Sequence, residues 1–178
     1  MLEVEVKYRA SHTQVRERLG LLGFSPAGLA EEEDVYFQHP CRDFAATDEA
    51  LRLRISGGRA ELTYKGPRAG AGAKTRLEVS VAVSGDAALL LRSLGFAEVA
   101  RVRKRREIYK RGSVTVYLDL VEGLGEFVEV ETLAGSGSDA ARAAGELRRL
   151  AGELGLREEV RETYLELLLR GAPAGKRL

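Results

Sequence analysis

The most constraining feature of this sequence is a repeated alternation of apolar and charged side chains over short runs. Over residues 2–7, leucine and valine at even positions alternate with Glu3, Glu5 and Lys7 at odd positions. Because successive side chains of a strand point to opposite faces, each such run predicts a β-strand with one apolar and one charged face. Similar alternation recurs over residues 51–55, 61–65, 74–83, 104–106, 114–119 and 128–131.

These runs predict a barrel with an unusual interior. With a weaker run over 35–38 they amount to about eight strands, the number at which a closed barrel encloses one small ligand. Residues 56–59, Ser-Gly-Gly-Arg, are expected to turn a hairpin, and a Gly- and Ala-rich loop follows over 66–73. If the apolar faces pack outward against helices, the charged faces line the interior. The expected class is therefore α+β, mainly β: a closed eight-stranded antiparallel barrel, or tunnel, with a polar charged lumen and outer helices.

Helical periodicity predicts the outer layer. Amphipathic helices are expected over 12–22, 86–94 and 139–154, with a short fourth helix over 162–170. The first two end alike, in Leu-Gly-Phe, which indicates two related halves. We expect a single domain over residues 1–170 and a frayed tail over 171–178.

Composition narrows the classes of function. The 178 residues carry a net charge of +1, which gives no overall attraction to nucleic acid or to an anionic membrane. Cys41 is the only cysteine, so an intramolecular disulfide is excluded. Charged residues begin at Glu3, and no apolar run is long enough for a signal peptide or a membrane helix. We therefore expect a cytoplasmic protein.

A lumen lined by ionisable groups needs charged contents, because an unpaired buried charge costs several kcal/mol. Arginine forks and lysine ammonium groups suit phosphate oxygens, and carboxylates suit a hard divalent cation that bridges to phosphate. Together they predict a site for a metal–polyphosphate complex. The basic set is Lys7, Arg52, Arg54, Lys65, Arg76, Lys104 and Arg106; the acidic set is Glu3, Glu5, Glu78, Asp119, Glu129 and Glu131.

Other features have simpler interpretations. The basic run 101–106 could bind nucleic acid, but alternation directs Lys104 and Arg106 inward and leaves the intervening arginines outside. His12 and His39 have no partners spaced for zinc or a catalytic triad, so both are expected to be structural or solvent-facing.

Seven segments occur in order along the chain: EVEVKYR, DVYFQHPCRDFAATDEALRLRI, LTYKGP, KTRLEVSV, RKRREIY, YLDLVEGLGEFVEVE and TYLELLL. Together they resemble the CYTH superfamily, the triphosphate tunnel metalloenzymes, and most closely its class IV adenylate cyclase-like branch. The resemblance implies that Glu3, Glu5, Glu129 and Glu131 bind Mg²⁺ or Mn²⁺. It also implies that Lys7 and the other residues of the basic set bind triphosphate. Glu78 and Asp119 would hold metal or orient basic residues. The catalytic group implied by the resemblance is Glu3, Glu5, Lys7, Glu129 and Glu131.

The resemblance does not fix the reaction. A class IV adenylate cyclase converts ATP to cyclic AMP and pyrophosphate, and would need an adenine pocket. The aromatic residues Tyr36, Phe37 and Phe44 could line such a pocket or simply belong to the core. The related triphosphatases hydrolyse inorganic, thiamine or nucleoside triphosphate. A polyphosphate- or nucleotide-binding module without turnover is the non-enzymatic alternative, although binding alone would need the bases more than the acids. The expected partner is a triphosphate-containing small molecule, with no nucleic acid and no membrane, and relatives suggest a homodimer.

Overall fold

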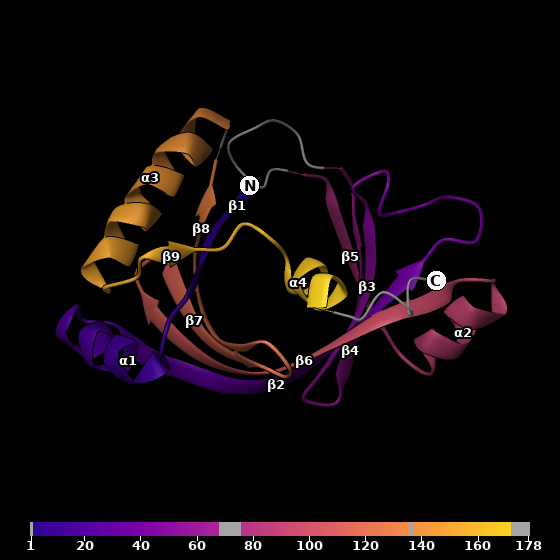
Figure 1. The fold of residues 1–178 in the computed structure, drawn as a ribbon, viewed down its shortest axis with the longest axis horizontal. Helices are drawn as coiled ribbons and strands as arrows, with labels where there is room; N and C mark the ends of the chain where they lie inside the picture. The colour runs from indigo at the N-terminus through magenta and orange to yellow at the C-terminus, as the bar shows by residue number, and fades with distance from the viewer. Residues whose placement is uncertain (1, 68–75, 136, 172–178) are drawn as a thin grey trace. The chain divides into compact units, whose positions relative to one another are not determined.

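The computed structural model describes residues 2–67, 76–135 and 137–171 (Figure 1). Residues 68–73 of the predicted Gly-rich loop and the tail beyond Gly171 lie outside the described residues. Within the described part, none of the helices has the length and apolar character that a membrane span requires.

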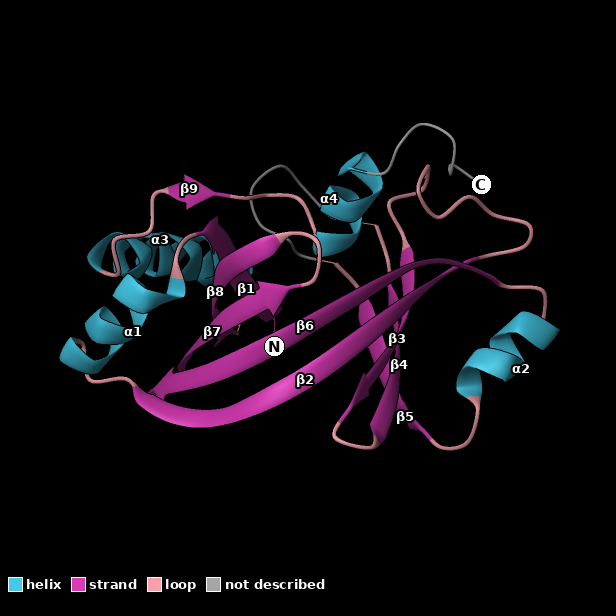
Figure 2. Ribbon diagram, turned by 60° about the horizontal axis from the view of Figure 1, so that its bottom comes forward, coloured by secondary structure: helices cyan, strands magenta, loops and turns pink. Residues whose placement is uncertain are grey.

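The described residues form four helices and nine strands, mainly β as predicted (Figure 2). The helices lie where the periodicity placed them: α1 at His12–Leu21, α2 at Ala87–Ser93, α3 at Gly137–Glu153 and α4 at Tyr164–Gly171. The strands are β1 (Leu2–Arg9), β2 (Ser25–Gln38), β3 (Ala50–Ser56), β4 (Arg59–Lys65), β5 (Glu78–Val83), β6 (Ala97–Arg111), β7 (Val114–Val121), β8 (Gly125–Ala134) and β9 (Glu158–Glu159).

The strands hydrogen-bond in the order β5-β4-β3-β2-β6-β7-β8-β1-β9. The described pairings do not join β5 to β9, so this sheet is open and the closed eight-stranded barrel is not confirmed. The additional strand, β9, is a two-residue strand paired with the end of β1. The predicted hairpin is present between β3 and β4. Its central residues Gly57 and Gly58 have φ values of 55° and 75°, which a two-residue hairpin turn of this type requires and glycine tolerates.

The described residues divide into two compact units, and strands β2 and β6 contribute to both. The first unit contains residues 2–30 and 105–161, and the second contains 31–67, 76–104 and 162–171. In the first unit, the apolar faces of β1, β7 and β8 pack against α1 and α3. The core there includes Val6, Leu19, Leu118, Val130 and Leu147.

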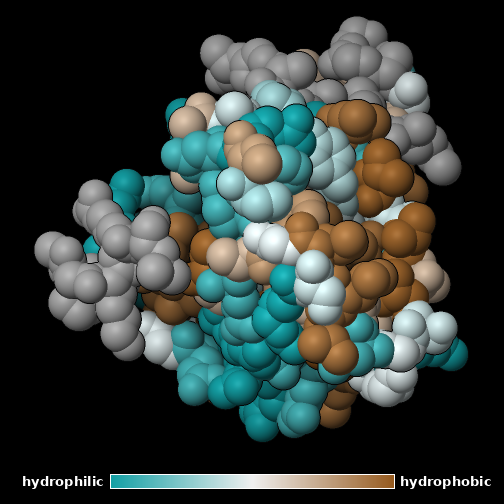
Figure 3. Space-filling view, turned by 90° about the vertical axis from the view of Figure 1, so that its right-hand side faces the viewer, coloured by the Kyte–Doolittle hydropathy of each residue, from teal (hydrophilic) through white to brown (hydrophobic). Residues whose placement is uncertain are grey.

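The second unit has a smaller core under α2. Val35, Phe37, Phe44, Leu53 and Leu91 are buried in it. Phe37 and Phe44 are thus core residues, the second of the two interpretations considered for them. Part of the apolar surface of this unit remains exposed, and Figure 3 shows hydrophobic side chains gathered on one face of the molecule. The exposed hydrophobic residues of β5, of the position just before it and of α2 are Leu77, Val79, Val81, Leu89 and Leu90.

The element order supports the two related halves. A strand, a helix and three strands occur twice in succession, as β1-α1-β2-β3-β4 and β5-α2-β6-β7-β8. Both helices end in the same way: the amide of Phe24 donates to the carbonyl of Leu19, and that of Phe96 donates to the carbonyl of Leu91. The intervening Gly23 and Gly95 have φ values of 77° and 91°. The matching Leu-Gly-Phe segments therefore encode the same helix end.

Candidate functional site: two charged strand faces

The charged face of the first unit is built by register. On antiparallel β1 and β8, Lys7 lies opposite Glu129 and Glu5 lies opposite Glu131, while Tyr117 on β7 lies opposite Glu129. The apolar neighbours of these residues point into the core, so alternation directs all of them to the other face. An acid-base pair and an acid-acid pair thus stand next to each other on the same two strands.

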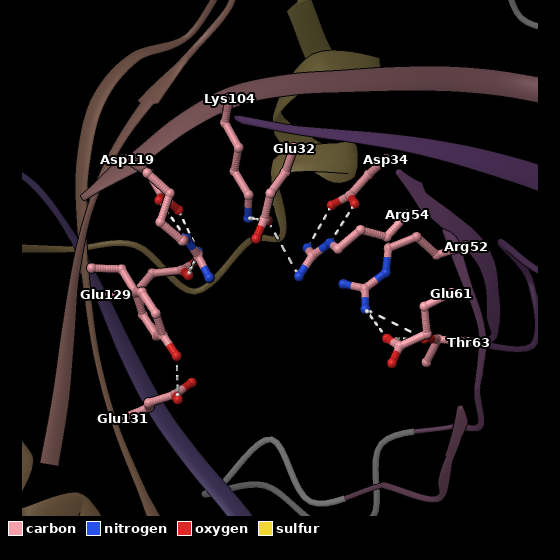
Figure 4. A network of polar contacts seen from close by, with 12 residues as sticks. Glu32, Asp34, Arg52, Arg54, Glu61, Thr63, Lys104, Asp119, Glu129 and Glu131 are labelled. Atoms are coloured by element: carbon pink, nitrogen blue, oxygen red, sulfur yellow. Dashed lines mark hydrogen bonds and ion pairs between the residues drawn. The ribbon is translucent and has the colours of Figure 1, made fainter. Parts of the chain in front are cut away.

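Arg106 on β6 joins the acids of β7 and β8. Its Nε and Nη2 donate to the two carboxylate oxygens of Asp119 at 2.6 and 2.5 Å, and Nη2 also contacts Glu129. Lys7 Nζ lies 3.4 Å from the other oxygen of Glu129. All four residues are buried. Two of the acidic residues predicted from the sequence, Asp119 and Glu129, are therefore paired with basic side chains in this structure. Their carboxylates are labelled in Figure 4.

Three other carboxylates on the charged face of the first unit, those of Glu3, Glu5 and Glu131, repel one another. Burial raises the pKa of Glu131, and the negative charges of Glu3 and Glu5 raise it further, against the hydrogen bond from Tyr117 and the charge of Arg106. Like charges directly opposite on paired strands destabilise a sheet. Such an arrangement is typical of a site whose ligand carries the opposite charge.

This donor set suits a divalent cation in its chemistry, because hard cations take carboxylate oxygens. Among the described residues, however, no group of three or more His, Cys, Asp or Glu side chains is already gathered in a geometry that could hold a metal. Residues Glu3, Glu5 and Glu131 are close enough to repel but would have to move to share an ion.

The charged face of the second unit centres on Arg54 of β3. Its Nε and Nη2 donate to the two oxygens of Asp34 at 2.7 Å each, and Nη1 lies 3.3 Å from Glu32 (Figure 4). Lys104 Nζ lies 3.2 Å from the same oxygen of Glu32. Burial alone would raise the pKa of Asp34, but the Arg54 fork and the charges of Arg54, Arg52 and Lys104 outweigh it and lower that pKa.

Arg52 is held much less firmly than Arg54. Its Nη2 lies 3.4 Å from the Thr63 hydroxyl and 3.9 Å from Glu61, both weak contacts. Its Nε is buried and has no hydrogen-bond acceptor among the described residues. A buried donor of a guanidinium group without an acceptor is costly in a folded protein. Arg52 therefore retains capacity to bind an anion.

Two more cations share this face with Arg52. Burial lowers the pKa of Lys65, and the charges of Arg52 and Arg76 lower it further, against the effect of Glu78. Glu78 Oε1 accepts from Lys65 Nζ at 2.8 Å and from Arg76 Nε at 3.4 Å. Glu78 is thus paired with two basic residues in this structure. Arg76 lies just before β5, because the strand begins at Glu78, later than predicted.

Alternation identified most of these residues but missed three. Glu32, Asp34 and Tyr117 share the charged faces. Glu32 and Asp34 belong to the acidic run 31–34. Because both have even numbers, alternation places them on the same strand face as Tyr36, so the sequence did contain a signal for them. Alternation correctly placed Lys104 and Arg106 inward, buried, with Arg103 and Arg105 exposed.

His12 has a structural role, which was one of the two alternatives predicted for it, the other being exposure to solvent. It is 2% exposed, and its Nε2 lies 3.0 Å from the carbonyl of Phe127. His39 packs edge-on against Phe96. Neither histidine belongs to the charged faces described above.

With this geometry established, comparison with known proteins gives the family. The CYTH domain family model matches residues 1–164, and the chain therefore belongs to the CYTH family. A provisionally named adenylate cyclase of Methanocaldococcus jannaschii is 37% identical over 94% of this chain and 98% of its own length. The adenylate cyclase CyaB of Aeromonas hydrophila is 33% identical over 90% of this chain and 84% of its own.

Solved structures agree on the fold. The PH1819 protein of Pyrococcus horikoshii matches with a TM-score of 0.87 and 43% identity, covering 96% of this chain and 99% of that one. A Hippeastrum protein with a reported dominant triphosphatase activity is only 16% identical, with a TM-score of 0.69 over 98% of this chain and 97% of its own. At that identity the likeness extends to the fold alone.

Proposed function

We propose that this protein is a metal-dependent enzyme acting on a triphosphate substrate, with adenylate cyclase of the class IV type as its first candidate activity. The observation that carries the proposal is the repulsion between like charges on each face, between carboxylates in the first unit and between cations in the second. Burial and then the neighbouring carboxylates raise the pKa of Glu131, and burial and then the neighbouring guanidinium groups lower the pKa of Lys65. Ligands of both signs, a divalent cation and a polyphosphate, would relieve this repulsion. The two relatives named as adenylate cyclases support the choice of reaction.

The residues would contribute mainly by binding and orientation. Arg52, Lys65 and Arg76 would bind phosphate oxygens, and Glu3, Glu5 and Glu131 would bind Mg²⁺ or Mn²⁺. When bound, such an ion supplies charge neutralisation along the phosphate chain. In the cyclase reaction the ribose 3′-oxygen attacks the α-phosphorus, pyrophosphate leaves, and the hydroxyl proton is released. Arg106 and Arg54, held in place by Asp119 and Asp34, would direct their positive charge at the developing negative charge.

Hydrolysis of a triphosphate is the second candidate. Phe37 and Phe44, two of the aromatic residues considered for an adenine pocket, are buried in the core of the second unit. Purine recognition therefore has no support from these two side chains. A triphosphatase would need only the phosphate and metal ligands, with water attacking the terminal phosphorus.

Product analysis tests the proposal. Purified protein is incubated with ATP, inorganic triphosphate or thiamine triphosphate, each with Mg²⁺ or Mn²⁺. Cyclic AMP with pyrophosphate supports the cyclase, and orthophosphate without cyclic AMP supports the hydrolase. Turnover of none of them would favour a binding module.

The metal assignment has its own test. We expect the double variant Glu129→Gln, Glu131→Gln to lose metal-dependent turnover while it still binds tripolyphosphate in the presence of a chelator. The matched control is Glu107→Gln, because Glu107 pairs with Arg16 outside the charged face. Undiminished turnover in the double variant would rule out Glu131 as a metal ligand.

A further inference from the structure

Tyr117 occupies a central position on the charged face of the first unit. It lies on β7 opposite Glu129, and its hydroxyl donates to Glu131 Oε1 at 2.6 Å, the bond drawn to Glu131 in Figure 4. Burial and the bond to Glu131 raise the pKa of this phenol, so the hydroxyl stays protonated and acts as a donor. The family resemblance and the charge pattern assign it no role.

The ring of the same residue supports Arg106. The guanidinium carbon of Arg106 lies 4.0 Å from the centroid of the Tyr117 ring. At this distance the cation is attracted to the face of the ring and its side chain is confined. Arg106 also forks Asp119, so its position is fixed from two directions.

We propose that Tyr117 is a positioning residue with two separable contacts: its hydroxyl orients Glu131 for a divalent cation, and its ring orients Arg106 for phosphate. This inference rests on the proposed function. The Tyr117 hydroxyl is a neutral donor, and because it fixes one oxygen of Glu131 it also determines where the other oxygen points. Partners of this kind, one step removed from a metal, commonly change its affinity by about 10- to 100-fold.

Two substitutions separate the two contacts. Tyr117→Phe removes the hydroxyl and keeps the ring over Arg106, whereas Tyr117→Leu removes both. Mn²⁺ affinity is measured by calorimetry without phosphate, and tripolyphosphate affinity is measured with a chelator and no metal. We expect Tyr117→Phe to weaken Mn²⁺ binding about 10- to 100-fold and to leave tripolyphosphate binding unchanged. Tyr117→Leu should weaken both.

Tyr109→Phe is the matched control. Tyr109 also donates its hydroxyl to a carboxylate of the first unit, that of Glu107 at 3.2 Å, but away from Glu131 and Arg106. A merely structural role for the phenol would lower the melting temperature of both Phe variants and leave Mn²⁺ binding unaltered in both. We expect Mn²⁺ affinity to fall in Tyr117→Phe alone.

The results also separate this inference from the proposed function. If Glu131→Gln reduces Mn²⁺ affinity and Tyr117→Phe does not, the positioning role of the hydroxyl is overturned while the metal site stands. If Glu131→Gln leaves Mn²⁺ affinity as in the natural protein, the metal assignment fails and this inference fails with it. If Tyr117→Leu binds tripolyphosphate as tightly as Tyr117→Phe, the role of the ring in orienting Arg106 is wrong.

Discussion

The two units present charged faces of opposite character. In the first unit, Glu131 faces the carboxylates of Glu3 and Glu5, and its pKa is raised. In the second unit, Lys65 faces the guanidinium groups of Arg52 and Arg76, and its pKa is lowered. Burial is the first cause of the shift in both cases, and repulsion between like charges adds to it. The like charges are carboxylates in one unit and cations in the other.

Each face also contains an arginine whose fork is paired with an aspartate. Arg106 with Asp119 in the first unit corresponds to Arg54 with Asp34 in the second. The groups beside each fork lie close to like charges. The comparison teaches that each face combines a paired fork, which stabilises the unit, with a cluster of like charges, which a ligand of opposite charge would stabilise.

The strongest test of the comparison removes two of the neighbouring positive charges from the second unit. We expect Arg52→Gln with Lys65→Gln to weaken tripolyphosphate binding by about 1000-fold, or ~4 kcal/mol, since two charge-assisted contacts are lost. Mn²⁺ binding in the absence of phosphate should be unchanged. Calorimetry measures both, with the exposed Arg105→Gln as control. Equal losses for Mn²⁺ and tripolyphosphate would contradict the division of roles.

The second test breaks a fork. Asp34→Asn should lower the free energy of unfolding by about 3 kcal/mol at neutral pH, because it leaves the Arg54 cation partly buried without its anion. The folded-state pKa of Asp34 is lowered, so its contribution is present above the ordinary carboxyl value of about 3.9 and is lost as pH falls through the folded value. Urea unfolding at neutral and acid pH should therefore show the difference from the natural protein shrinking in acid.

A neighbouring carboxylate provides the control for this test. Glu33 pairs with Arg101 at the surface, and its pKa is also lowered, first by the hydrogen bond from Arg101. Such exposed pairs contribute at most about 1 kcal/mol. A loss in Glu33→Gln as large as that in Asp34→Asn would mean that burial of the fork is irrelevant.

The smallest effect has the opposite sign. Glu131→Gln should raise the free energy of unfolding of the metal-free protein by up to about 1 kcal/mol, because it removes repulsion between opposed carboxylates. Such a change corresponds to roughly 2–4 °C in melting temperature for a domain of this size. Because the pKa of Glu131 is raised, the penalty is absent in acid, grows as pH rises through the ordinary carboxyl value, and persists above the folded value. Melting curves across this pH range should show no gain for Glu107→Gln, and a fall for Glu131→Gln at neutral pH would contradict the repulsion.

Alternation predicted the strands and the faces because side-chain direction in a strand depends only on local sequence. It correctly separated Lys104 and Arg106 from Arg103 and Arg105. It could not predict which charges pair, since that depends on register between distant strands. Glu129 was expected to bind metal, but β1 and β6 bring Lys7 and Arg106 to it. Closure of the sheet was inferred from the number of strands, and number alone does not determine closure.

The register of β1 also bears on how the chain folds. β1 pairs along its whole length with β8, so that Leu2 lies opposite Ala134 and Arg9 lies opposite Phe127. β1 is synthesised before β8 and must therefore wait for the intervening polypeptide before this partner exists. Pairings of such high contact order make folding slow and leave a strand edge exposed in the meantime. The alternating charges Glu3, Glu5 and Lys7 then serve the nascent chain as well, because a charged strand edge resists pairing with the wrong neighbour.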